Sequence, residues 1–215
     1  MAGYETTRRR FRPAIVAIAP AVLLAGFAYH PYVSRPTDEA ALAVAAASDT
    51  TRWGLSHPAI GVGYGLAVLA FIAIRSYLRE VGEERWSVLA LPFTALGCAM
   101  FTILTGMEFA LLAAAETGGD VEGAQTELTP WFVPLLVMGG ISSALGALGF
   151  AIGITRSKML SAQLTSLVTG ATLDLCAALA VDVDARRVAA TTSTLFHSFN
   201  DEGEARSWPA RQSSA

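Results

Sequence analysis

Charged residues are scarce in this chain. Of its 215 residues, 15% are Asp, Glu, Lys or Arg, 53% are hydrophobic, and the mean hydropathy is +0.47. Soluble domains carry about 25% charged residues, so this composition excludes an ordinary water-soluble fold. The formal net charge is only −3, and no basic patch with interleaved aromatic residues occurs. Nucleic acid is therefore excluded as a partner.

Cysteine is also rare, and the common catalytic motifs are missing. Cys98 and Cys176 lie in different apolar stretches without a C-x-x-C spacing, which excludes a disulfide framework and a thiolate zinc site. The chain contains no H-E-x-x-H, P-loop or G-x-S-x-G motif. The sequence thus favours no enzyme class and identifies no cofactor.

Long apolar runs are what the chain does contain. Four of them, each bounded by charged residues, cover residues 13–29, 58–74, 86–107 and 130–155. Each is close to the roughly 20 residues that a helix needs to cross a bilayer. A weaker fifth run covers 159–181. We expect an all-α, polytopic transmembrane bundle of four to five spans within residues 13–181, with the lipid bilayer as its solvent.

The two ends of the chain differ from this core. Residues 1–12 form a basic segment, whereas residues 182–215 are polar and are predicted to be disordered. The first run is either a retained span or a cleaved signal peptide, because it ends in Ala25-Gly26-Phe27-Ala28, where small residues would permit cleavage. The loss of apolar character after about residue 172 also raises the hypothesis that the tail is a frame-shifted or truncated end.

Basic residues lie mainly on one side of the runs. Nine occur before the first run, after the second and after the fourth, against two in the segment 31–57 and none in 108–129. The positive-inside rule then places the N-terminus in the cytoplasm and the segments 31–57 and 108–129 outside. We expect a multi-pass protein of the plasma membrane.

Local signals predict where helices begin and end. Residues 40–47 are rich in alanine and predict a short surface helix capped by Thr37. Thr129 is the expected N-cap of the fourth span, with Pro130 in its first turn. Gly118 is expected to end a preceding helix. Trp53 and other tryptophans beside the span ends predict an aromatic belt at the membrane surface.

Small residues recur at helical spacing within the runs. Gly61 and Gly65 form one G-x-x-x-G motif, and Gly149 and Gly153 form another. Such rows let helix backbones approach closely in a membrane. They predict packing inside the bundle or, alternatively, a face that binds a second copy or another membrane protein.

Three polar residues near the predicted outer face are candidates for a metal site. His30 closes the first run, His57 opens the second, and Glu108 ends the third, with Glu116 further along the same side. Two imidazoles and a carboxylate suit zinc or another divalent ion. The same groups could respond to protonation, or the histidines could simply cap span ends at the interface.

A proton-coupling role is the other candidate chemistry. An ionisable residue within a membrane span is a functional hypothesis by default. Glu108 lies at the end of its run, and Asp174 would lie near mid-membrane if the fifth run spans. Asp174 is therefore either a second proton-coupling candidate or a sign that residues 159–181 do not span.

Four short segments resemble small bacterial multi-span membrane proteins. They cover residues 52–57, 82–87, 106–109 and 129–134. The resemblance extends over about residues 10–170 and implies a helical membrane fold without any particular activity.

Three functional hypotheses remain open. The first is a structural or accessory bundle, or a permease-like one. The second is a metal-binding or redox membrane protein that uses His30, His57 and Glu108. The third is a proton-coupled small-molecule transporter that uses Glu108 and Asp174.

Overall fold

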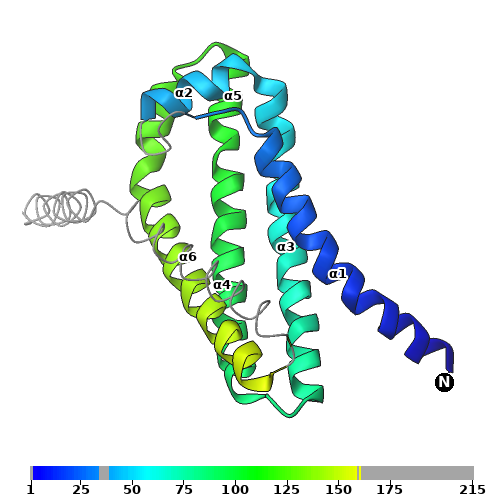
Figure 1. Cartoon of the computed structure of the whole chain (residues 1–215). Helices are drawn as coiled ribbons and strands as arrows, with labels where there is room; N and C mark the ends of the chain where they lie inside the picture. Colours follow the sequence, from blue (N-terminus) through cyan, green and yellow to red (C-terminus); the bar gives the residue numbers. More distant parts are fainter. Residues whose placement is uncertain (1, 34–38, 159, 161–215) are drawn as a thin grey trace, which may run out of the picture. The chain divides into compact units, whose positions relative to one another are not determined.

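The computed structural model describes residues 2–33, 39–158 and 160, and this part of the chain is helical without any strand. The all-α prediction is thus confirmed. The elements are α1 (Ala2–Tyr29), α2 (Glu39–Ser48), α3 (Thr50–Glu80), α4 (Arg85–Met107), α5 (Phe109–Thr117) and α6 (Val121–Ser157) (Figure 1).

Four helical stretches are long and apolar enough to cross a membrane. They are Phe11–Tyr29, Thr50–Glu80, Arg85–Thr117 and Val121–Ser157. They contain the four predicted runs, which confirms a membrane-spanning type of architecture. The weaker fifth run, the polar tail and Asp174 lie outside the described residues, apart from residue 160.

The fourth span begins earlier than the sequence predicts. α6 starts at Val121, and the carboxylate of Asp120 caps it by accepting the backbone N–H of Gly123 at 2.9 Å. Thr129 and Pro130 lie inside the helix, so their assignment as N-cap and first turn is wrong. Residues 121–129 include Glu122, Gln125 and Glu127 and so fall outside the apolar run, and the hydropathy pattern alone does not show that they are helical.

Two short helices lie at the same end of the bundle (Figure 1). α2 confirms the predicted alanine-rich helix, although Thr37 lies outside the described residues. The carboxylate of Glu39 in α2 accepts hydrogen bonds from the hydroxyls of Thr126 and Thr129 in α6, at 2.9 and 2.8 Å. α5 ends at Thr117 and is capped by Gly118, whose φ of 70° confirms the predicted glycine cap.

α4 and α6 pack closely along their length, because glycine lets the two backbones approach. A Cβ atom added at Gly146 would lie 2.7 Å from the backbone nitrogen of Thr94, and one at Gly97 would lie 2.9 Å from that of Ser143. Packing inside the bundle therefore explains these two glycines. Gly65 has open space around its Cβ position.

Among the described helices, α1 packs mainly against α3. Gly63 of α3 lies against Leu23 of α1, where an added Cβ would come within 3.1 Å of the leucine backbone nitrogen. The guanidinium of Arg12 in α1 forms an ion pair with Glu80, the last residue of α3. Among the described helices, α3 thus provides most of the packing that holds α1 on the bundle.

The long helices run antiparallel to their neighbours in the chain (Figure 1). The beginning of α1, the α3–α4 turn and the end of α6 lie at one end, whereas α2 and α5 lie at the other. The site described below lies at the α2 and α5 end.

Candidate functional site

His57 lies one helical turn after Trp53 on the buried face of α3. Its side chain is 2% exposed. Its Nδ1 atom lies 2.6 Å from the backbone carbonyl oxygen of Trp53, and the Ser56 hydroxyl donates to the same carbonyl at 3.1 Å. A carbonyl oxygen only accepts hydrogen bonds, so Nδ1 carries the proton. The lone pair of the neutral ring is then on Nε2.

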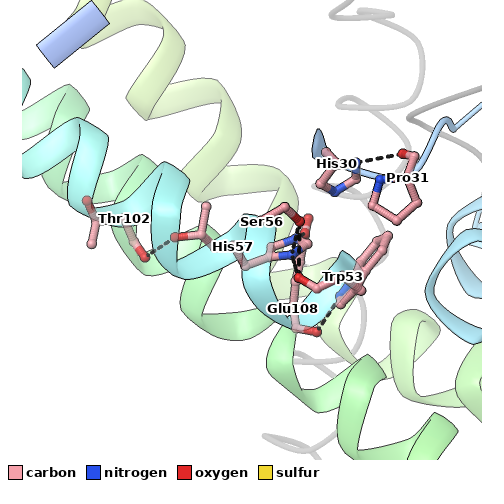
Figure 2. Close-up of polar contacts among 8 residues, drawn as sticks. His30, Pro31, Trp53, Ser56, His57, Thr102 and Glu108 are labelled. Carbon is pink, nitrogen blue, oxygen red and sulfur yellow. Dashed lines mark hydrogen bonds and ion pairs between the residues drawn. The ribbon is translucent and has the colours of Figure 1, made fainter. Parts of the chain in front are cut away.

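Glu108 lies at the junction between α4 and α5, where it ends one helix and precedes the next. Its carboxylate contacts Nε2 of His57 (Figure 2). Its backbone carbonyl accepts a hydrogen bond from the indole N–H of Trp53 at 3.2 Å. Trp53 thus holds the junction against α3 while the carboxylate reaches the imidazole. The Glu108 side chain is 16% exposed, so the contact is largely shielded.

His30 follows the last residue of α1 and faces the same cluster. Its ring centroid lies 4.9 Å from those of Trp53 and His57. Its Nδ1 lies 2.7 Å from the carbonyl oxygen of Pro31, so Nδ1 of this ring is also the protonated nitrogen (Figure 2). Both imidazoles therefore have Nε2 left for a ligand.

Burial lowers the pKa of His30 below its ordinary value of 6.5. The hydrogen bond to Pro31 and the charge of Glu108 oppose this shift, whereas His57 and Arg52 add to it. The lowered pKa keeps the ring neutral at pH 7, and the neutral ring is the form that binds metal ions.

The structure brings the three predicted site residues together. One ligand atom from each of His30, His57 and Glu108 lies within 4.8 Å of the others. Tetrahedral ligands at about 2.0–2.1 Å from a zinc ion lie about 3.3 Å apart, so small side-chain shifts would suffice to coordinate an ion. Glu116 is exposed and stands outside this group.

Arg52 connects the cluster to the end of α1. Its Nε donates to the carbonyl of Tyr29 at 2.9 Å, and its Nη2 donates to that of His30 at 3.3 Å. These bonds satisfy carbonyls that the end of a helix leaves free. Arg52 thereby fixes the segment that carries His30 and adds a positive charge beside the site.

A cavity of about 670 Å³ adjoins the cluster, and all three candidate ligands line it. Beyond them its wall is mostly apolar and continues into the span, with Ile60 and Tyr64 from α3, Phe101 from α4 and Leu136 from α6. This volume falls in the range of ligand pockets. A molecule in the cavity could reach the histidines and the carboxylate.

Trp53 is the site residue that sequence reasoning missed. It was expected at the membrane surface, yet it is 1% exposed and packs against Leu42, Ala46 and Leu111. Its position four residues before His57 puts both side chains on one helix face, and this spacing was the available signal. Trp131 is 71% exposed, as a residue at an aromatic belt would be.

Comparison with known proteins found no matching family model, no matching curated protein and no matching solved structure. The resemblance to small bacterial multi-span proteins therefore stays a prediction. The four apolar helices define the class of the chain as a helical membrane protein. Its function has to be inferred from the site.

Proposed function

We propose that this chain is a membrane protein that binds a divalent transition-metal ion, with zinc as the best fit, through His30, His57 and Glu108. The observation that carries the proposal is the convergence of one ligand atom from each residue within 4.8 Å. Two imidazoles and one carboxylate form a ligand set that zinc uses when one coordination position stays open.

The surroundings of the two histidines support the proposal. A metal-binding histidine almost always donates its other ring N–H to a carbonyl or carboxylate, which fixes the ring and its tautomer. Nδ1 of His57 faces the Trp53 carbonyl, and Nδ1 of His30 faces that of Pro31.

The His57–Glu108 contact supports it as well. With Nδ1 protonated, Nε2 of a neutral His57 and the Glu108 carboxylate are both acceptors. Two acceptors in contact repel each other. A positive charge between them removes this repulsion, and either a metal ion or a proton can supply that charge. A bound ion would replace the direct contact and separate the two atoms.

The test is the metal content of the full chain purified in mild detergent. We expect one zinc per chain, and a weakening of zinc affinity by at least about 100-fold in His57→Ala, His30→Ala and Glu108→Gln. Glu116→Gln is the matched control, because it removes an exposed carboxylate at the same end. Absence of a stoichiometric metal, both as purified and after loading with zinc, would sink the proposal.

A second candidate is proton coupling, which the same His57–Glu108 contact favours. A proton held between the two groups would make Glu108 the coupling residue of a transporter. In that case Glu108→Gln abolishes pH-dependent uptake while the protein contains no metal. The structural, accessory and permease-like hypotheses stay predictions, since no contact in the described helices favours them.

A further inference from the structure

The cavity extends beyond what a metal ion needs. Its polar end holds His30, His57 and Glu108, and its wall continues along α3 to Tyr64. Tyr64 lies seven residues after His57, which is about 10 Å along a helix. The space therefore suits a molecule with a compact polar group and a longer apolar part.

The polar end has a positive charge once an ion is bound. A divalent cation and one carboxylate leave a net positive charge, and the guanidinium of Arg52, which also lines the cavity, adds another. Three protein ligands leave zinc one open coordination position. An anionic oxygen donor meets both requirements, whereas a neutral alcohol offers a donor atom without the negative charge and a protonated amine offers neither.

The apolar end of the cavity reaches the surface of the spans. Phe27 of α1 and Leu136 of α6 both line the cavity, and they are 53% and 37% exposed. Each belongs to a helix that is apolar enough to cross a membrane. A molecule dissolved in lipid could thus enter from the side with its polar group directed towards the histidines.

We propose that the open position of the metal takes the carboxylate of a single-chain amphiphile, whose apolar chain occupies the cavity between α3, α4 and α6. This inference rests on the proposed metal site and adds a ligand to it. The carboxylate binds the ion, and Arg52 attracts it. Side chains such as Ile60 and Phe101 contact the chain.

The test uses Co²⁺ in place of zinc, because the visible absorption of tetrahedral Co²⁺ changes when a fourth ligand binds. The full chain in detergent is loaded with Co²⁺ and titrated with decanoate, acetate or decanol. We expect decanoate to change the spectrum at a concentration at least about 100-fold lower than acetate, because burial of each methylene favours binding. Decanol leaves the spectrum unchanged.

Two variants separate binding in the cavity from enrichment of decanoate in the micelle. Leu136→Trp fills the apolar wall, and we expect it to keep the Co²⁺ spectrum while needing at least about 10 times more decanoate. Leu145→Trp is the control, because Leu145 is 47% exposed on the same helix and does not line the cavity. It should behave as the parent protein does.

The outcomes distinguish the two proposals. If Co²⁺ binds but decanoate acts no better than acetate, or if Leu136→Trp titrates as Leu145→Trp does, the amphiphile is rejected and the metal site stands. If decanol changes the spectrum as decanoate does, the carboxylate is not the ligand and the inference also fails. If the chain binds neither Co²⁺ nor zinc, both proposals fail together.

Discussion

At the scale of single residues, Trp53 connects the parts of the site. Its ring packs near His30 and His57, its indole N–H bonds the Glu108 carbonyl, and its own carbonyl faces Nδ1 of His57. One side chain thus contacts both histidines and the segment that carries the carboxylate. The geometry of the three candidate ligands depends on this residue although it offers no ligand atom itself.

Replacing Trp53 with Phe should weaken the site and the fold together. The variant keeps an aromatic ring but leaves the partly buried Glu108 carbonyl without its indole partner, a loss of about 1 kcal/mol in the free energy of unfolding. We expect a lower midpoint of thermal unfolding in detergent and a zinc affinity about 10-fold weaker. Trp131→Phe, at a position 71% exposed, is the control and should change neither quantity. An unchanged affinity in Trp53→Phe would remove Trp53 from the site.

The candidate ligands could be predicted from the sequence, but their contacts could not. Topology alone puts His30, His57 and Glu108 at one end of the bundle, because each ends or begins an apolar run. For these side chains to meet, α3 must also turn the face that carries His57 into the bundle, and the chain must break between α4 and α5 at Glu108. Both features depend on how the helices pack, which a single sequence does not show. Helix packing also explains why the predicted surface position of Trp53 is wrong. A tryptophan at a span end is usually interfacial, and only the packing of α3 buries this one.

At the scale of helices, the missing side chain of Gly146 sets the distance between the backbones of α4 and α6. An added Cβ at Gly146 would lie 2.2 Å from Oγ1 and 2.7 Å from the backbone nitrogen of Thr94. Contacts this short against backbone cannot be relieved by a side-chain rotation. The helix pair would have to separate, and small residues are what membrane helices use to avoid such separation.

Gly146→Ala should therefore destabilise the bundle. We expect a loss of about 1–3 kcal/mol, the usual effect of overpacking. Gly65→Ala is the matched control, because its Cβ position has no neighbour within 4 Å and alanine favours helix by up to about 1 kcal/mol. The measurement is the unfolding midpoint of both variants in the same detergent. Equal midpoints would show that α4 and α6 tolerate a wider spacing.

The spans were easier to predict than their ends. Four apolar runs sufficed to identify four helices, because the cost of placing free backbone groups in lipid leaves few other structures. The N-cap of α6 is nevertheless Asp120 and not the expected Thr129, because a capped polar segment extends the helix beyond the apolar run. Hydropathy detects the part of a helix that contacts lipid and not the part that contacts water.

At the scale of the whole molecule, the ends of the helices divide the chain into two faces. The start of α1 and the α3–α4 turn lie at one end, and α2 with α5 lies at the other (Figure 1). The excess of Arg and Lys belongs to the first end. The positive-inside rule then predicts that the proposed metal site faces outward.

Labelling of single cysteines in intact cells tests this orientation. Glu116→Cys and Glu84→Cys, each in a background with Cys98 and Cys176 changed to Ser, place a thiol at exposed positions of the two ends. We expect a membrane-impermeant maleimide to label Glu116→Cys in intact cells and Glu84→Cys only after lysis. The reverse pattern would place the site in the cytoplasm and contradict the charge rule for this chain.

The packing of α1 mainly against α3, among the described helices, has a consequence for how the protein assembles. His30 follows α1, whereas His57 belongs to α3 and Glu108 to the α4–α5 junction, so an ion bound by all three would join the first span to the two next to it. The coupling is reciprocal. If packing of α1 on α3 raises the affinity for the ion, then binding of the ion stabilises that packing by the same free energy. The metal would then act as a removable cross-link, and the hold of α1 on the bundle would rise and fall with the supply of metal outside the cell.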